Sequence, residues 1–128
     1  MKNITKLTII MSLIYYYQKL KRQMVVITYS NIAIVFLNFL ISEGLINGFS
    51  VEETKITVFL KYNFNGSPVI KELKKLSTNR RRVTACLEKL QQNKHQYGIF
   101  ILSTPVGFIT HKTAINAHIN GTLLFFVR

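Results

Sequence analysis

A run of hydroxyl and glycine residues near the C-terminus has the side chains best suited to binding a polar partner. Ser103-Thr104-Pro105-Val106-Gly107 follows the apolar stretch Ile99–Leu102. Hydroxyls both donate and accept hydrogen bonds, which matches the 2′-hydroxyls and base edges in the shallow groove of RNA. Gly107 carries no side chain, so a partner can approach the backbone amides around it closely. The same stretch also fits an ordinary turn after a strand, and both interpretations stay open on these residues alone.

A second group of side chains could bind phosphates. Cations that neutralise phosphates release counterions, so binding of this kind weakens steeply with salt. Lysines on a solvated face would give a similar pattern, but three consecutive arginines favour phosphate contact. The six cations of this run are Lys71, Lys74, Lys75, Arg80, Arg81 and Arg82.

The chain has few residues that could serve in catalysis or bind a metal ion. The chain has no aspartate, and none of its five glutamates pairs with another in a catalytic context. Cys86 is the single cysteine, which excludes a disulfide or a cysteine zinc site within the chain. His95, His111 and His118 have no ligand partners at metal-site spacing, and we expect them at the surface or beside a bound RNA. We therefore predict no enzyme, no catalytic residue, no metal, no cofactor and no small-molecule substrate.

Composition favours a folded protein with an anionic partner. Seventeen Lys and Arg against five acidic residues give a net charge of +12. Such an excess repels itself in a compact chain, and nucleic acid, an anionic membrane or an acidic protein would relieve the repulsion. A hydrophobic content of 48% is too high for a disordered basic tail. Residues 65–128 carry ten basic and two acidic groups, which makes this half the stronger candidate for anion binding.

Two helices and a sheet are predicted in the first half of the chain. Apolar spacing predicts a buried helix over residues 3–17, and the β-branched segment Met24–Thr28 predicts a strand. Ser30 is a suitable N-cap for a nearly all-apolar helix over Asn31–Ser42, which Gly44 would end.

An alternating strand and a turn follow. Lys55–Tyr62 alternates apolar and polar residues, Asn63–Gly66 has turn chemistry, and we predict that Pro68–Leu76 pairs as the next strand. These elements form a predicted N-terminal α+β lobe over residues 1–76.

The second half is predicted to be a mainly β lobe over residues 77–128. Ser77–Arg82 would join the lobes, and Glu88–Gln96 would contain a short helical turn. The predicted fold class is therefore α+β in two small lobes. The strands expected in the second lobe are Val83–Leu87, Ile99–Leu102, Phe108–Thr110 and Leu123–Val127, with a tight turn at Asn120-Gly121.

The N-terminus superficially resembles a signal peptide, with Lys2 and Lys6 before the apolar Leu7–Tyr17. Those eleven residues are too few to span a bilayer, and no small-residue cleavage site follows. We predict a buried helix here and no membrane insertion.

The order of several segments resembles the family of ribosomal protein eight of the small subunit, in its universal bacterial-type form. The resemblance covers nearly the whole chain and implies a two-lobe α+β protein. Such a protein binds the central domain of small-subunit ribosomal RNA, beside neighbouring ribosomal proteins, and supports assembly and translation. The segments are Ile56–Tyr62 (ITVFLKY), Pro68–Ser77 (PVIKELKKLS), Arg80–Arg82 and Gly98–Gly107 (GIFILSTPVG).

The resemblance also implies site residues. Ser103, Thr104 and Gly107 match the family's serine-threonine-x-x-glycine loop, and Gly121 matches its glycine-glycine-glutamate turn. Ser77 and Arg82 match the ends of the joint between the lobes. The full set predicted to contact RNA is Ser103, Thr104, Gly107, Asn120, Gly121, Thr122, Lys71, Lys74, Lys75, Ser77, Arg80, Arg81 and Arg82.

Several positions depart from the family pattern, and four of them lie in the predicted RNA-binding loop and turn. Pro105 and Val106 stand where serine and lysine are usual, Asn120 replaces a glycine, and Thr122 replaces the glutamate. The loop keeps its hydroxyls and its glycine but loses charge. We therefore expect it to bind RNA by shape and backbone more than by charge.

Residue usage biased towards Ile, Asn, Lys, Tyr and Phe follows AT-rich codons. It suggests an organellar version of the family, encoded in the organelle and working in the mitochondrial matrix. A plastid or the cytoplasm of an AT-rich bacterium would fit the same bias. Two other functions stay open: a small basic membrane-associated protein, and an RNA-binding regulator outside the ribosome.

Overall fold

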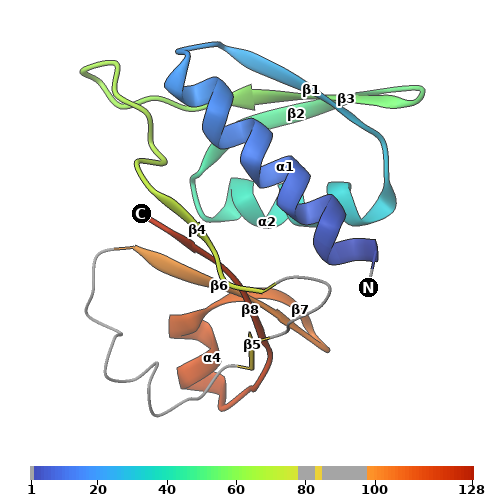
Figure 1. The fold of residues 1–128 in the computed structure, drawn as a ribbon, viewed down its shortest axis with the longest axis vertical. Coiled ribbons are helices and arrows are strands. Elements are labelled where there is room, and N and C mark those ends of the chain that lie inside the picture. Colours follow the sequence, from blue (N-terminus) through green and yellow to red (C-terminus); the bar gives the residue numbers. More distant parts are fainter. Residues whose placement is uncertain (1, 78–82, 85–97) are drawn as a thin grey trace. The chain divides into compact units, whose positions relative to one another are not determined.

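The computed structural model describes residues 2–77, 83–84 and 98–128, and their elements form two α+β units (Figure 1). One unit comprises residues 2–71 and the other begins at Glu72. Each unit has its own sheet, so the predicted α+β class is confirmed.

The first unit contains helices α1 (Lys2–Lys19) and α2 (Asn31–Ser42) with strands β1 (Met24–Thr28), β2 (Ile46–Glu52) and β3 (Lys55–Leu60). The strands form an antiparallel sheet in the order β1-β3-β2, and both helices lie on one side of it (Figure 1). Alternate residues of β1 and β3 are buried, as period-two side-chain alternation requires for a sheet with one covered face.

Local signals account for both helices. The buried side chains Ile4, Leu7, Met11 and Ile14 recur at helical spacing along α1. The hydroxyl of Ser30 caps α2 by accepting a hydrogen bond from the Ala33 amide at 3.2 Å. The predicted helices and the predicted cap are confirmed.

The strand prediction was incomplete in the first unit. Strand β2 was not predicted, because Asn47, Gly48 and Ser50 interrupt the apolar alternation and the register shifts between Ile46 and Gly48. The strand predicted over Pro68–Leu76 is present only at Leu73–Lys75, and it does not pair with the preceding strand. Both edges of β3 are already occupied by β1 and β2, and Pro68 makes only an isolated bridge with Tyr62.

The second unit is built on β4 (Leu73–Lys75), β5 (Val83–Thr84), β6 (Ile99–Thr104), β7 (Gly107–Thr110) and β8 (Thr122–Val127). Its sheet runs β4-β8-β6-β7, and β5 also pairs with β8. A short helix, α4 (His111–Ala117), packs against β6 and β7. The core of this packing consists of Leu102, Ala114 and Ile115, with Phe100, Ile109 and Leu123 packed around them.

Helix α4 was not predicted from the sequence. Its signals are weak: Thr110 caps it by accepting from the Thr113 amide at 3.4 Å, and only His111, Ala114 and Ile115 face the core. The expectation that His111 lies at the surface was wrong. Its side chain is 1% exposed, and its Nδ1 accepts a hydrogen bond from the Phe100 amide at 3.1 Å. The helical turn predicted over residues 88–96 lies outside the described residues.

Candidate nucleic-acid interface

The Ser103–Gly107 segment is the turn that joins β6 to β7. Thr104 and Gly107 are partners across this hairpin. The Thr104 hydroxyl donates to the Gly107 carbonyl at 2.8 Å and accepts from the Val106 amide at 3.3 Å. Since a hydroxyl has a single proton to donate, the donor of Thr104 is used within the turn. The side chain of Thr104 therefore fixes the backbone conformation of the turn.

Gly107 is required by its backbone conformation. Its φ is +118°, which side chains with a Cβ rarely adopt, and no heavy atom lies within 4 Å of a Cβ placed there. The space beside Gly107 is open. At the tip of the same turn, Val106 is 70% exposed.

Ser103 offers a free hydroxyl. Its side chain is half-buried and makes no hydrogen bond to any residue that the structure describes. Ser103 pairs with Phe108 on one side and with Thr122 on the other. Its hydroxyl can therefore both donate to and accept from a bound molecule.

The Asn120–Thr122 segment leads into β8 and lies directly beside this loop, and no turn forms at Asn120-Gly121, where one was predicted. A Cβ at Gly121 would be 2.5 Å from the Ser103 carbonyl oxygen and 2.6 Å from Cγ2 of Thr104. Only glycine fits such a close approach. The two segments that the sequence singled out separately are thus brought together by the pairing of β6 with β8.

The part of the chain that carries the β6–β7 turn and the Asn120–Thr122 segment has little charge of its own. Residues 98–128 contain no carboxylate side chain, and Lys112 and Arg128 are their only Lys or Arg residues. No carboxylate of this segment repels a phosphate, and one exposed lysine, Lys112, follows the β6–β7 hairpin. The arrangement suits recognition through hydroxyls and backbone groups.

The structure places Ser77 inside the second unit. Its side chain is 2% exposed, and its hydroxyl donates to the Leu123 carbonyl. This hydrogen bond holds the end of the β4 segment against β8, so the hydroxyl of Ser77 is used within the protein. The predicted phosphate-binding residues Arg80, Arg81 and Arg82 lie outside the described residues.

The lysines of the basic run do not form one surface. Lys74 and Lys75 are neighbours in β4, so their side chains point to opposite faces of the sheet. Nζ of Lys74 lies 3.5 Å from a Glu72 carboxylate oxygen, and Glu72 also pairs with Arg128 at 3.7 Å. Lys71 belongs to the first unit and is exposed.

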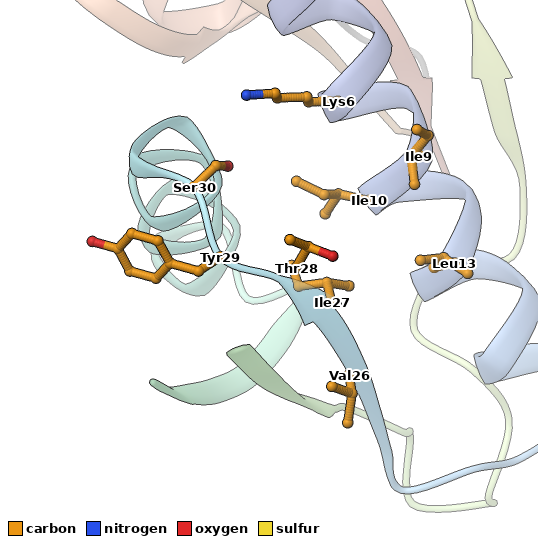
Figure 2. Close-up of a pocket in the computed structure, with 9 residues that line it drawn as sticks. All are labelled: Lys6, Ile9, Ile10, Leu13, Val26, Ile27, Thr28, Tyr29 and Ser30. Carbon is orange, nitrogen blue, oxygen red and sulfur yellow. The ribbon is translucent and has the colours of Figure 1, made fainter. Parts of the chain in front are cut away.

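A separate hollow of 310 Å³ opens between α1 and β1 in the first unit (Figure 2). Ile9, Ile10, Leu13 and Val26 contribute apolar side chains, and Lys6 is its one charged residue. None of the residues predicted to contact RNA lines it.

The described residues contain neither a cluster of metal ligands nor a helix suited to crossing a membrane. Within the described ranges, no three His, Cys, Asp or Glu side chains come together as metal ligands. None of the described helices combines the length and the apolar character needed to cross a membrane.

Comparison with known proteins identifies the family. Residues 6–127 match the sequence profile of the family described as Ribosomal protein S8. A protein of Nitrobacter hamburgensis named "Small ribosomal subunit protein uS8" is 41% identical over 96 residues, covering 71% of this chain and 72% of the relative. Proteins of the same name from Rhodopseudomonas palustris strain BisA53 and Nitrobacter winogradskyi are 38% and 40% identical over the same shares. The chain therefore belongs to the ribosomal protein S8 family.

Proposed function

We propose that this chain is a structural, RNA-binding constituent of the small ribosomal subunit, in which the β6–β7 turn and the Asn120–Thr122 segment bind ribosomal RNA together. The observation that carries the proposal is the close approach of Gly121 to Ser103 and Thr104. Because of this approach, Ser103–Gly107 and Asn120–Thr122, each a weak indication of RNA binding in the sequence, form one surface. The protein is not an enzyme, as its family is one of ribosomal proteins.

Hydroxyl and backbone chemistry would dominate at this surface. Ser103 presents a free hydroxyl, Asn120 is exposed, and the backbone at Gly107 has open space beside it. These groups match the 2′-hydroxyls and base edges of an irregular RNA helix, which proteins read largely by shape. The target we propose is a helix in the central domain of the small-subunit RNA.

Phosphate contacts would supply the salt-dependent part of the affinity. Arg80, Arg81 and Arg82 follow the anchored Ser77, and guanidinium groups bind phosphates through two parallel hydrogen bonds. Lys71 and Lys75 are exposed and add positive charge.

Neighbouring ribosomal proteins are the second class of partner. The hollow between α1 and β1 is bordered by exposed Ile9 and Val26 (Figure 2). Exposed Val35 extends the apolar surface onto α2. Apolar surface of this kind, rimmed by polar groups, is typical of protein contacts.

We place the protein in the mitochondrial matrix, as an organelle-encoded subunit. The support is the composition, which is rich in Ile, Asn, Lys, Tyr and Phe. Fractionation of cells followed by sedimentation of organellar ribosomes tests this location, and recovery of the chain with ribosomes of another compartment would contradict it.

Two measurements test the function itself. In a sucrose gradient the chain should sediment with small subunits, and ultraviolet crosslinking should join it to ribosomal RNA. Absence from the small-subunit peak would overturn the proposal and favour a regulator outside the ribosome. In a filter-binding assay with the central-domain helix, Ser103→Ala should lower the affinity with little change in its salt dependence.

A further inference from the structure

The turn after β3 presents one aromatic side chain to solvent. Phe64 is 113% exposed relative to its reference value, so nothing in the chain covers it. The turn around it is held by hydrogen bonds: the Asn63 amide donates to the Ser67 carbonyl at 2.8 Å and the Gly66 amide to the Asn63 carbonyl at 2.9 Å. Asn65 accepts from the amide and the hydroxyl of Ser67, at 3.0 and 2.7 Å. The ring of Phe64 is therefore fully exposed on a turn that hydrogen bonds hold in place.

Cations gather beside this turn from three segments of the first unit. The Gln18 side chain donates to the Lys61 carbonyl at 3.2 Å, which joins the end of α1 to the end of β3. The Tyr62 hydroxyl donates to the Arg22 carbonyl, and the Tyr15 hydroxyl donates to the Lys71 carbonyl at 3.4 Å. Nζ of Lys19 lies 4.4 Å from the centre of the Tyr15 ring. Of the neighbouring cations, Lys61 and Lys71 line the hollow beside Phe64, and the segment at the end of α1 adds three more. The five residues named here the cationic cluster are Lys19, Lys21, Arg22, Lys61 and Lys71.

The charge of this cluster is uncompensated. None of its five cations forms an ion pair with a carboxylate in the part of the chain that the structure describes. Glu52 and Glu53 lie at the opposite end of the sheet, where Glu52 pairs with Lys55 across the β2–β3 hairpin. Glu43 is the carboxylate nearest to the cluster in the first unit, because a Cβ on its neighbour Gly44 would be 3.6 Å from Nζ of Lys61, and it forms no ion pair with that lysine. Unpaired cations held together in this way attract an anionic chain.

An open hollow connects the aromatic ring to the cations. It has a volume of 720 Å³ and is lined by Lys61, Tyr62, Asn63, Phe64, Asn65, Ser67 and Lys71. Apart from the two rings, its side chains are cations, amides and a hydroxyl. An apolar protein surface would leave these groups without partners, whereas a nucleotide satisfies them with phosphate, sugar and base.

We propose that Phe64 and the cationic cluster form a second RNA site, which takes an unpaired strand. Phe64 stacks on one base, and the cations neutralise the phosphates on either side of it, as in stacking platforms for single-stranded nucleic acid. This inference rests on the proposed function as an RNA-binding protein. It adds a different substrate, an unpaired strand rather than a helix, and a different unit of the protein.

Binding of a labelled short oligouridine to the full chain tests the site. Uridines stack weakly on one another, so the strand is free to stack on the protein. Phe64→Leu should weaken binding roughly tenfold, since one base loses its aromatic partner. Tyr29→Leu is the matched control, because Tyr29 is an exposed aromatic residue at the opposite end of β1 and should leave the affinity unchanged. Equal affinities of wild type and Phe64→Leu would overturn the inference.

The absence of tryptophan from the chain allows a direct optical test. Phe64→Trp introduces a single indole that can still stack, so this variant should keep its affinity for oligouridine and lose fluorescence on binding. Tyr29→Trp should show no such quenching. An unchanged Phe64→Trp signal at saturating oligouridine would contradict stacking.

The two proposed sites fail in different ways. A chain that binds the central-domain helix, with Ser103→Ala impaired and Phe64→Leu unaffected on both RNAs, keeps the proposed function and loses the second site. If Phe64→Leu binds oligouridine normally but loses a crosslink to a neighbouring ribosomal protein, Phe64 is a protein contact and the inference is wrong. A chain that binds neither RNA refutes both.

Discussion

Gly121 lies so close to Ser103 that a Cβ on it would come within 2.5 Å of the Ser103 carbonyl oxygen. The obstacle is the backbone of β6, paired on both sides at Ser103, which cannot move aside as a flexible side chain can. This close approach makes the β6–β7 turn and the Asn120–Thr122 segment a single surface. Gly121 is needed there for lack of space and not for its backbone conformation, since it is not among the glycines with positive φ.

Gly121→Ala should therefore damage both folding and RNA binding. The methyl group must push β6 away from the Asn120–Thr122 segment, and overpacking of this kind costs about 1–3 kcal/mol. Thermal unfolding and filter binding with the central-domain helix measure the two effects. Gly48→Ala is the matched control, because a Cβ at Gly48 meets no atom within 4 Å. An unchanged melting temperature for Gly121→Ala would contradict the close packing.

Thr104 and Ser103 should respond differently to loss of their hydroxyls. Thr104→Val removes the hydrogen bonds that close the turn and should lower the free energy of unfolding by about 1 kcal/mol. Ser103→Ala removes a hydroxyl with no partner among the described residues, so it should leave stability unchanged and weaken RNA binding. Urea unfolding of both variants distinguishes them, and equal destabilisation would show that Ser103 is also part of the turn.

The arginine run should set the salt dependence. Replacing Arg80, Arg81 and Arg82 by alanine should flatten the plot of log affinity against log salt, by roughly 0.9 for each duplex phosphate that the variant no longer neutralises. Ser103→Ala should leave this slope as it is. Filter binding over a range of potassium chloride concentrations measures both slopes, and an unchanged slope in the triple variant would exclude the arginines from phosphate binding.

His118 ends α4 in a conformation that favours glycine. Its φ is +53° and its ψ is 43°, a left-handed geometry that strains residues with a Cβ. His118→Gly should raise the free energy of unfolding by about 1 kcal/mol. Ala117→Gly, one residue earlier and still helical, should lower it by a similar amount. Chemical denaturation measures both, and destabilisation by His118→Gly would show that the imidazole makes interactions that outweigh the strain.

Tyr62 should make the first unit sensitive to alkali. Burial raises the pKa of its phenol above the ordinary value of 10.0. Below that value the phenol is protonated in both folded and unfolded chains. Above it the unfolded chain loses the proton first, so stability falls as the pH rises through the raised pKa.

The comparison with Tyr62→Phe isolates this effect from the other tyrosines. At neutral pH the variant lacks the hydrogen bond to the Arg22 carbonyl and should be less stable than the wild type. The difference in free energy of unfolding between the two proteins should narrow above about pH 10. Only the wild type loses stability there, because only its unfolded chain gains from ionising the phenol of Tyr62. Urea unfolding at several alkaline pH values measures this difference, and a constant difference would contradict the raised pKa.

Much of the first unit could be read from the sequence. Ser30 and Gly44 mark the ends of α2, and the alternation of Ile56, Val58 and Leu60 marks the buried face of β3. These signals act between residues within a turn of helix or along one strand, so they are visible without knowing the rest of the fold. Helix α4 could not be predicted from the sequence, because its buried residues are few and one of them is a histidine.

The sequence by itself determined the family, the basic charge, the α+β class and the two segments that carry hydroxyls and glycine. Only the tertiary structure decided how those residues are used. The register of β6 against β8 puts Gly121 beside Ser103, and the β6–β7 hairpin turns the Thr104 hydroxyl inward and leaves that of Ser103 free. Pairing between strands distant in the chain depends on register and bulges, and a pairing shifted by one residue would reverse which side chains face a partner.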